Sequence, residues 1–296
     1  MTGLLSTIGT LAVASRPLSW INTAYPFAAV YLLTTGGVDA TFVIGTLFFL
    51  VPYNFLMYGV NDVFDYSSDL ANPRKGGVEG ATLPPRLHRV TLIAAVALAV
   101  PFVVALVMLA DGRPWFWALL AISLFAVVAY SAPGLRFKEI PFLDSVTSSL
   151  HFVLPALCGL ALAGTAVTGA IVVTMTAFFL WGMASHAFGA VQDIVPDRAA
   201  GIGSIATALG AAATVRLAVG LWLGAGVLML FTPWPAALAA AAAVPYVVSA
   251  APYLRVSDEE SGNVNVAWRR FLAINYVTGF AVTMLLIVGY LEGLFS

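Results

Sequence analysis

The sequence predicts an all-α integral membrane protein that crosses the bilayer nine times, with its N-terminus in the cytoplasm and its C-terminus outside. Three observations support this prediction: the composition, the length of the apolar runs, and the side on which basic residues fall. Of the 296 residues, 61% are hydrophobic and 9% are charged, whereas soluble domains carry about 25% charged residues. Because a soluble fold of this length could not bury so much apolar surface, the bilayer is the expected solvent.

Nine apolar runs are long enough to cross a bilayer, which requires about 20 residues in a helix. The runs lie at residues 18–36, 40–61, 89–110, 115–131, 143–164, 169–191, 213–232, 234–254 and 271–291. Residues 1–16 precede them and are expected to form an interfacial segment. Residues 1–296 together are expected to form a single transmembrane domain.

The basic residues divide unevenly between the two sides of the membrane. With the N-terminus inside, all of the 13 lysines and arginines except Arg113 fall on cytoplasmic segments, as the positive-inside rule requires. The outer connections are short, whereas the inner connections are long and polar. We therefore expect a protein of the cell membrane whose functional site lies at the cytoplasmic face, with no nucleic-acid partner.

The first motif, Asn61-Asp62-Val-Phe-Asp65-Tyr-Ser-Ser-Asp69, ends the second run. On a helix its three aspartates lie at i, i+3 and i+7, which is one face. A carboxylate at membrane depth costs about 2.5–3.5 kcal/mol on insertion scales, so a positive partner is needed. A hard divalent cation with oxygen ligands is the natural candidate, and a solvated acidic helix end is the alternative.

The second motif, Gln192-Asp193-Ile-Val-Pro-Asp197-Arg198, ends the sixth run. Asp193 and Asp197 are four residues apart and share a helix face. Alone, this pair fits an ordinary acidic helix end equally well. Together with the first motif on the same membrane side, it provides the two clusters that Mg²⁺ ions bridging a diphosphate would require.

Candidate diphosphate ligands lie in the loops beside these motifs. Arginine, lysine and tyrosine can bind phosphate oxygens directly, although basic residues on this side also serve as topological anchors. Arg198 could bind diphosphate or neutralise Asp197. The other candidates that follow the first motif or the fourth run are Arg74, Lys75, Tyr130, Arg136 and Lys138.

Two histidines lie inside predicted spans, where polar side chains usually face the bundle interior. His186 lies on the stripe of Asp193 and could accept a proton, orient an acceptor substrate, or simply pack between helices. His151 fits a structural role better. The single Cys158 excludes an internal disulfide, and the sequence leaves the oligomeric state and any partner subunit open.

The nine runs and paired motifs resemble the UbiA superfamily of intramembrane prenyltransferases over essentially the whole chain. The resemblance implies a UbiA-type bundle that binds Mg²⁺ and a prenyl diphosphate, with Asp65, Asp193, Tyr130 and Lys138 in catalysis. Tyr130 and Lys138 match the Tyr/Lys loop of the family, and Asn61 also belongs to the diphosphate site. The implied metal ligands are Asn61, Asp62, Asp65, Asp69, Asp193 and Asp197.

Three segments carry a narrower resemblance, to the lycopene elongases of C50 carotenoid biosynthesis. They are residues 15–26, 72–81 and 179–185. This resemblance implies Mg²⁺-dependent transfer of C5 units from dimethylallyl diphosphate to the ends of lycopene, which gives C45 and C50 products within the membrane lipid. The alternatives are a quinone precursor, haem or glycerol-phosphate lipid as acceptor and, more distantly, an ion transporter.

Overall fold

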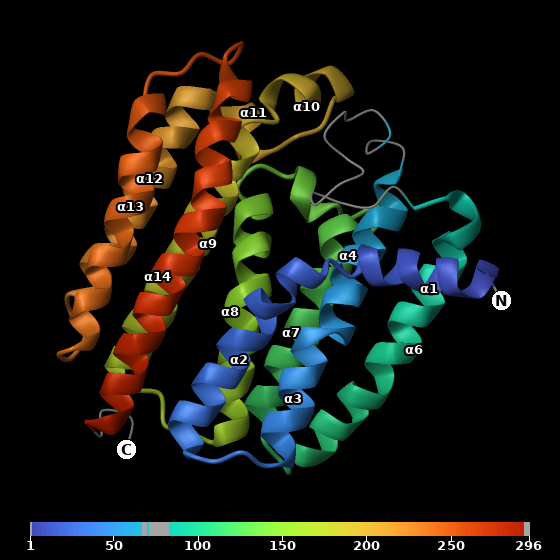
Figure 1. Ribbon diagram of the computed structural model, residues 1–296, viewed down its shortest axis with the longest axis vertical. Coiled ribbons are helices and arrows are strands. Elements are labelled where there is room, and N and C mark those ends of the chain that lie inside the picture. The colour runs from blue at the N-terminus through green and yellow to red at the C-terminus, as the bar shows by residue number, and fades with distance from the viewer. Residues whose placement is uncertain (1, 67–69, 71–82, 293–296) are drawn as a thin grey trace. The chain divides into compact units, whose positions relative to one another are not determined.

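The computed structural model describes residues 2–66, 70 and 83–292, and every regular element in these residues is a helix (Figure 1). In this part of the chain, eight helices are long and apolar enough to cross a membrane. They coincide with the second to the ninth predicted runs. Their bounds are Ala40–Phe64, Pro85–Leu109, Pro114–Ser131, Leu143–Ala163, Gly169–Val191, Ala211–Met229, Ala236–Tyr253 and Ser261–Leu291.

The first predicted run is shorter than expected. It contains η1 (Pro17–Ser19) and α2 (Trp20–Thr35), and α2 has 16 residues. Such a helix rises about 24 Å, which is less than the roughly 30 Å of the hydrocarbon core. A ninth crossing and the membrane orientation of both termini therefore stay predictions.

The helices form two compact units, one of residues 1–136 and 154–165 and the other of residues 137–153 and 166–296. That residues 1–296 act as one domain stays a prediction. The chain changes unit within α8 (Leu143–Ala163). The first unit also contains α1 (Thr2–Ala14), η1, α2, α3 (Ala40–Leu50), α4 (Pro52–Phe64), α6 (Pro85–Leu109) and α7 (Pro114–Ser131).

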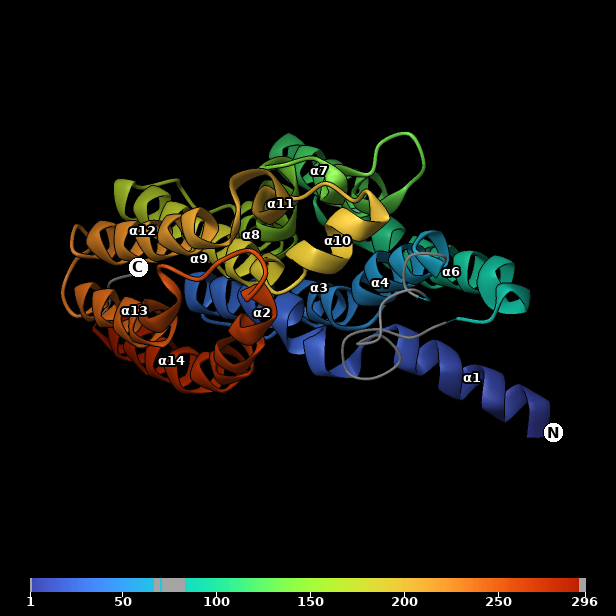
Figure 2. The same cartoon turned by 90° about the horizontal axis from the view of Figure 1, so that it is seen from above.

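Within the first unit, aromatic packing joins the helices. α2 packs on α3, and α4 packs on α6 and α7, while α1 crosses α4 (Figures 1 and 2). Phe27, Phe48, Phe49 and Tyr53 are fully buried in its core. The Phe27 ring lies directly on Gly45, where an added Cβ would overlap it, so only glycine allows this approach of α2 to α3.

The second span is interrupted at Val51, between α3 and α4. Pro52 starts α4, and its missing N–H removes a donor from the preceding turn. The buried Asn54 offsets this loss, because its Nδ2 donates to the carbonyls of Phe49 (2.9 Å) and Leu50 (3.0 Å). In a membrane such carbonyls need a partner from the protein. The break is thereby stabilised by a side chain one turn away.

The second unit packs around a different aromatic core. α9 (Gly169–Val191) packs on α12 (Ala211–Met229), and α12 packs on α13 (Ala243–Ala250). Phe188, Trp222, Tyr246 and Phe271 fill the space between them. The remaining elements are η2 (Phe137–Glu139), α10 (Ile194–Ala200), α11 (Ile205–Leu209), η3 (Ala236–Ala242), η4 (Ala251–Tyr253), η5 (Ser261–Val264) and α14 (Asn265–Leu291).

Candidate functional site

The first aspartate motif forms the last turn of α4. The amide of Asp65 donates to the carbonyl of Asn61 over 2.9 Å, so Asp62 and Asp65 keep the helical spacing. Both carboxylates are buried, with 1% of Asp62 and 4% of Asp65 exposed. Asp69, Arg74 and Lys75, which were predicted to join this site, lie outside the described residues.

Arg16 is the cationic partner of Asp62. Its Nη2 lies 2.9 Å from Asp62 Oδ1, and its guanidinium lies 4.3 Å from the centre of the Tyr58 ring. The backbone of Arg16 is left-handed, with φ of 52°, a conformation that costs about 1–3 kcal/mol in a non-glycine residue. From the sequence, Arg16 was expected only to contribute to the positive charge of the cytoplasmic side. An arginine that directly precedes Pro17 at the start of an apolar run was the available signal.

Arg136 is the corresponding partner of Asp65. Its Nη2 lies 3.6 Å from Asp65 Oδ1, so the structure brings this predicted diphosphate ligand to the first motif. Arg136 is also left-handed, with φ of 42°. Ser131 at the end of α7 donates to Asn61 Oδ1 over 2.8 Å. The motif is therefore held by two strained arginines and a serine.

The donor set of this turn fits a hard divalent cation. Asp62 and Asp65 offer carboxylate oxygens, and Asn61 offers an amide oxygen. No group of three or more His, Cys, Asp or Glu side chains that could hold a metal occurs among the described residues. Mg²⁺ does not require one, because it commonly binds through one or two carboxylates together with water and substrate phosphates. The arginines add positive charge suited to a diphosphate.

The second motif lies where α9 ends and α10 begins. Asp193 is the N-cap residue of α10, and its carbonyl accepts a hydrogen bond from the amide of Asp197 over 2.8 Å. The two aspartates therefore have the predicted spacing of one turn. Both are partly exposed on a helix of seven residues. The aspartates of the second motif are therefore more exposed than those in the buried turn of the first motif.

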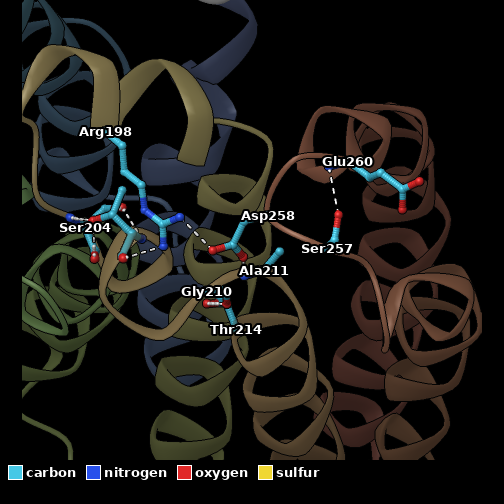
Figure 3. Close-up of polar contacts among 9 residues, drawn as sticks. Arg198, Ser204, Gly210, Ala211, Thr214, Ser257, Asp258 and Glu260 are labelled. Atoms are coloured by element: carbon cyan, nitrogen blue, oxygen red, sulfur yellow. Dashed lines mark hydrogen bonds and ion pairs between the residues drawn. The ribbon is translucent and has the colours of Figure 1, made fainter.

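Arg198 follows the second motif and contacts Asp258 (Figure 3). Its Nη1 lies 2.6 Å from Asp258 Oδ2, and its Nη2 donates to the carbonyl of Thr207 over 3.0 Å. Asp258 Oδ1 accepts from the amide of Ala211, the first residue of α12, over 2.6 Å. That amide and the guanidinium lower the pKa of Asp258. Arg198 thus fastens α10 and α11 to the start of α12.

A buried carboxylate faces His186 on α9. His186 Nε2 lies 3.6 Å from Asp144 Oδ2, and the side chains of His186 and Asp144 are 21% and 0% exposed. Asp144 was not among the residues predicted from the sequence. Its place at the start of an apolar run was the available signal, because ionisable residues in membrane segments are functional candidates by default.

The remaining predicted ligands lie in two different elements. Tyr130 belongs to the last turn of α7, and Lys138 belongs to η2. Both are partly buried. Their roles toward a diphosphate stay predictions.

The family model described as "UbiA prenyltransferase family" matches residues 23–275. A "Lycopene elongase/hydratase" of Corynebacterium glutamicum is 48% identical over 284 residues, which cover 96% of this chain and 98% of that protein. A "C(50) beta-cyclic carotenoids biosynthesis protein" of a Dietzia species is 53% identical over 286 residues. The match covers 96% of this chain but only 65% of the Dietzia protein.

Two solved structures share the fold. A UbiA homologue from Archaeoglobus fulgidus bound to DMAPP and Mg²⁺ has a TM-score of 0.66 at 19% identity, over 91% of this chain and 98% of that chain. A digeranylgeranylglyceryl phosphate synthase has a TM-score of 0.63 at 15% identity, over 97% of this chain and 99% of that chain. At these identities the likeness establishes the fold alone.

Proposed function

This chain belongs to the UbiA prenyltransferase family and is a multi-pass membrane prenyltransferase, and from that premise we propose its reaction. It transfers C5 units from dimethylallyl diphosphate to the ends of lycopene in a Mg²⁺-dependent reaction, giving C45 and C50 carotenoids. The observation that carries this proposal is the buried turn of Asp62 and Asp65, each paired with an arginine. It is suited to a metal-bound diphosphate.

The acceptor is proposed from the relatives. The Corynebacterium protein named as a lycopene elongase/hydratase matches this chain almost from end to end, at 48% identity. A chain of that similarity and nearly equal extent is expected to share the acceptor class. The Dietzia protein, whose name refers to C50 carotenoids, is longer, and this chain matches 65% of its length.

The metal would be held by the aspartates of the two motifs. Asn61, Asp62 and Asp65 are the proposed ligands in the first unit, and Asp193 and Asp197 those in the second. The Archaeoglobus homologue of the same fold carries DMAPP and Mg²⁺. When bound, Mg²⁺ would neutralise the negative charge that develops on the departing diphosphate.

The chain's own side chains would prepare the donor for ionisation. Arg136 holds the Asp65 carboxylate and could also donate to a diphosphate oxygen, since a guanidinium carries five N–H donors. Tyr130 and Lys138 are proposed as further donors, as are Arg74 and Lys75. As the C–O bond breaks, its electron pair leaves with the diphosphate, and the terminal alkene of lycopene attacks the allylic carbon. An apolar surrounding would keep water from the cation.

We propose that this site faces the cytoplasm in the cell membrane, with the N-terminus inside and the C-terminus outside. The distribution of the basic residues supports this orientation. Reporter fusions at each terminus test it. A cytoplasmic signal from the C-terminal fusion would contradict the proposed topology and the count of nine crossings.

The product mass after expression in a lycopene-making host tests the proposed reaction. We expect carotenoids that are heavier by one and two C5 units, and loss of diphosphate release in Asp65→Ala and Asp193→Ala. Lycopene that stays C40 with dimethylallyl diphosphate supplied would overturn the acceptor. Diphosphate release that survives both substitutions would overturn the metal site.

A further inference from the structure

We propose that His186 is the proton acceptor that ends the prenyl transfer and that Asp144 is its positioning residue. The inference deepens the proposed function and rests on it. Attack by the alkene electron pair on the allylic carbon leaves a tertiary cation, and one proton must be lost before the neutral product can leave. The pair of His186 and Asp144 in the second unit has the chemistry to take that proton.

Asp144 is fixed by contacts from two directions. Its Oδ1 accepts from the amide of Ser145 over 2.7 Å, and its Oδ2 accepts from the amide of Ile205 over 2.8 Å. The second bond joins the start of α8 to the first residue of α11. The two backbone amides therefore fix the position of the carboxylate. The remaining side of Oδ2 faces His186.

The geometry defines a role for each imidazole nitrogen. Neutral imidazole carries one N–H donor and one lone-pair acceptor. With Nε2 toward the carboxylate at 3.6 Å, the favoured tautomer places hydrogen on Nε2 and leaves the lone pair on Nδ1. Protonation of Nδ1 then produces an imidazolium beside a fixed negative charge. This is the orienting logic of an acid–histidine pair.

The position of His186 suits a proton lost near the diphosphate. His186 lies five residues before Val191, the last residue of α9, about 7.5 Å along the helix at 1.5 Å per residue, and Asp193 follows two residues after that end. The new C–C bond forms at the donor carbon that carried the diphosphate, and the departing proton lies a few bonds farther. Its side chain is 21% exposed, so the imidazole is open to a ligand.

The step balances in charge and atoms. The donor C–O bond breaks with its electron pair on the diphosphate, and the alkene pair forms the new C–C bond. A C–H bond next to the tertiary cation then breaks, its electron pair forms an alkene, and the proton goes to His186. If water adds to the cation first, the same nitrogen takes the proton from that water. One proton and one diphosphate are released for each C5 unit.

His151 provides the matched control. It lies seven residues after Asp144 on α8 and is only 3% exposed. It is a second intramembrane histidine of the same unit, but its burial keeps it from an acceptor. His151→Gln therefore tests whether loss of any buried imidazole disturbs the reaction.

The experiment measures diphosphate released per C5 unit transferred, with the full chain in lipid vesicles that contain lycopene. Wild type is expected to give a ratio near one. His186→Gln is expected to raise the ratio about tenfold or more. A tertiary cation that keeps its proton reverts to lycopene and the C5 cation, and water then captures the C5 cation as a prenyl alcohol while ionisation of the donor continues. Asp144→Asn should raise it less, and His151→Gln should leave it unchanged. Added imidazole should lower the ratio of His186→Ala.

Three outcomes decide the inference. Wild-type ratios in His186→Gln and Asp144→Asn, with C5 transfer intact, would overturn it while the proposed function stands. A raised ratio in His151→Gln of equal size would also overturn it. Absence of C5 transfer in wild type would overturn the proposed function itself, and this inference with it. Thermal unfolding of each variant in detergent shows that the compared proteins are folded.

Discussion

The two aspartate motifs have similar sequences but contrasting surroundings. Asp62 and Asp65 are 1% and 4% exposed, and each faces an arginine with a left-handed backbone. Asp193 and Asp197 lie partly exposed on a short helix, and the neighbouring Arg198 contacts Asp258. The first motif is therefore a fixed turn whose negative charges are balanced by two arginines. The second motif lies at a short helix that is held by the contact of Arg198 with Asp258. Two carboxylates on one helix face therefore do not imply equal rigidity.

The largest expected effect is on the reaction itself. Asp65→Asn should lower the rate of diphosphate release by roughly 10²–10³-fold, the range seen when one group that stabilises a developing anion is lost. Asp197→Asn should cost less, because its carboxylate is partly exposed and less fixed. Single-turnover kinetics on both variants measure the difference. Equal losses of rate in the two variants would show that the burial of an aspartate does not determine how much it contributes to diphosphate release.

The next effect is on stability. Arg16→Ala removes the ion pair between Arg16 and the buried Asp62, and breaking a buried pair costs about 3–5 kcal/mol. Thermal unfolding in detergent should show the loss, and the double variant with Asp62→Asn should regain part of it. A stability within 1 kcal/mol of wild type, roughly the worth of an exposed pair, would show that Asp62 does not depend on Arg16.

A smaller effect distinguishes Arg136 from Arg198, which were both candidate diphosphate ligands in the sequence. Arg136→Ala should lower kcat/KM for dimethylallyl diphosphate by about tenfold, which corresponds to roughly 1.4 kcal/mol. Arg198→Ala should change kcat/KM less and should instead lower the melting temperature, because Arg198 joins α10 and α11 to α12 through Thr207 and Asp258. A larger kinetic loss in Arg198→Ala would restore its predicted role at the diphosphate.

The smallest effect concerns the pH dependence of Asp258. Its pKa is lowered from 3.8 by the Ala211 amide and by Arg198, so its contribution is present above pH 3.8 and is lost as pH falls through the lowered folded-state pKa. Asp258→Asn should cost about 1 kcal/mol at pH 7, since the pair is partly exposed. Melting temperatures of wild type and variant should approach each other as the pH falls below 3.8 and should converge below the lowered pKa of Asp258. A gap that persists in acid would contradict this account.

Most of the helical architecture could be predicted from the sequence. Apolar run length is a local property, and the predicted run 169–191 coincides with α9. The interruption at Pro52 was missed, because average hydrophobicity does not reveal a break inside an apolar run. The shortness of α2 was also missed, since its flanking residues are apolar but form η1 and a turn.

The candidate site was predicted in part. What was missed depends on contacts between residues that are far apart in the sequence. The aspartate motifs are local patterns, so their spacing was visible. Arg16 contacts Asp62 from 46 positions away, and Asp144 contacts Ile205 from 61 positions away. Arg198 likewise contacts Asp258 from 60 positions away. A local sequence pattern does not indicate which distant residue a charged side chain will contact.

The left-handed arginines have a consequence for how substitutions at these two positions are interpreted. Glycine would relax the backbone at Arg16 or Arg136 but would remove the charge, whereas lysine would keep the charge but lack the planar guanidinium. No single replacement preserves both properties. Scoring matrices that treat arginine and lysine as interchangeable will therefore misjudge variants here, and a library meant to alter the acceptor should leave both codons fixed.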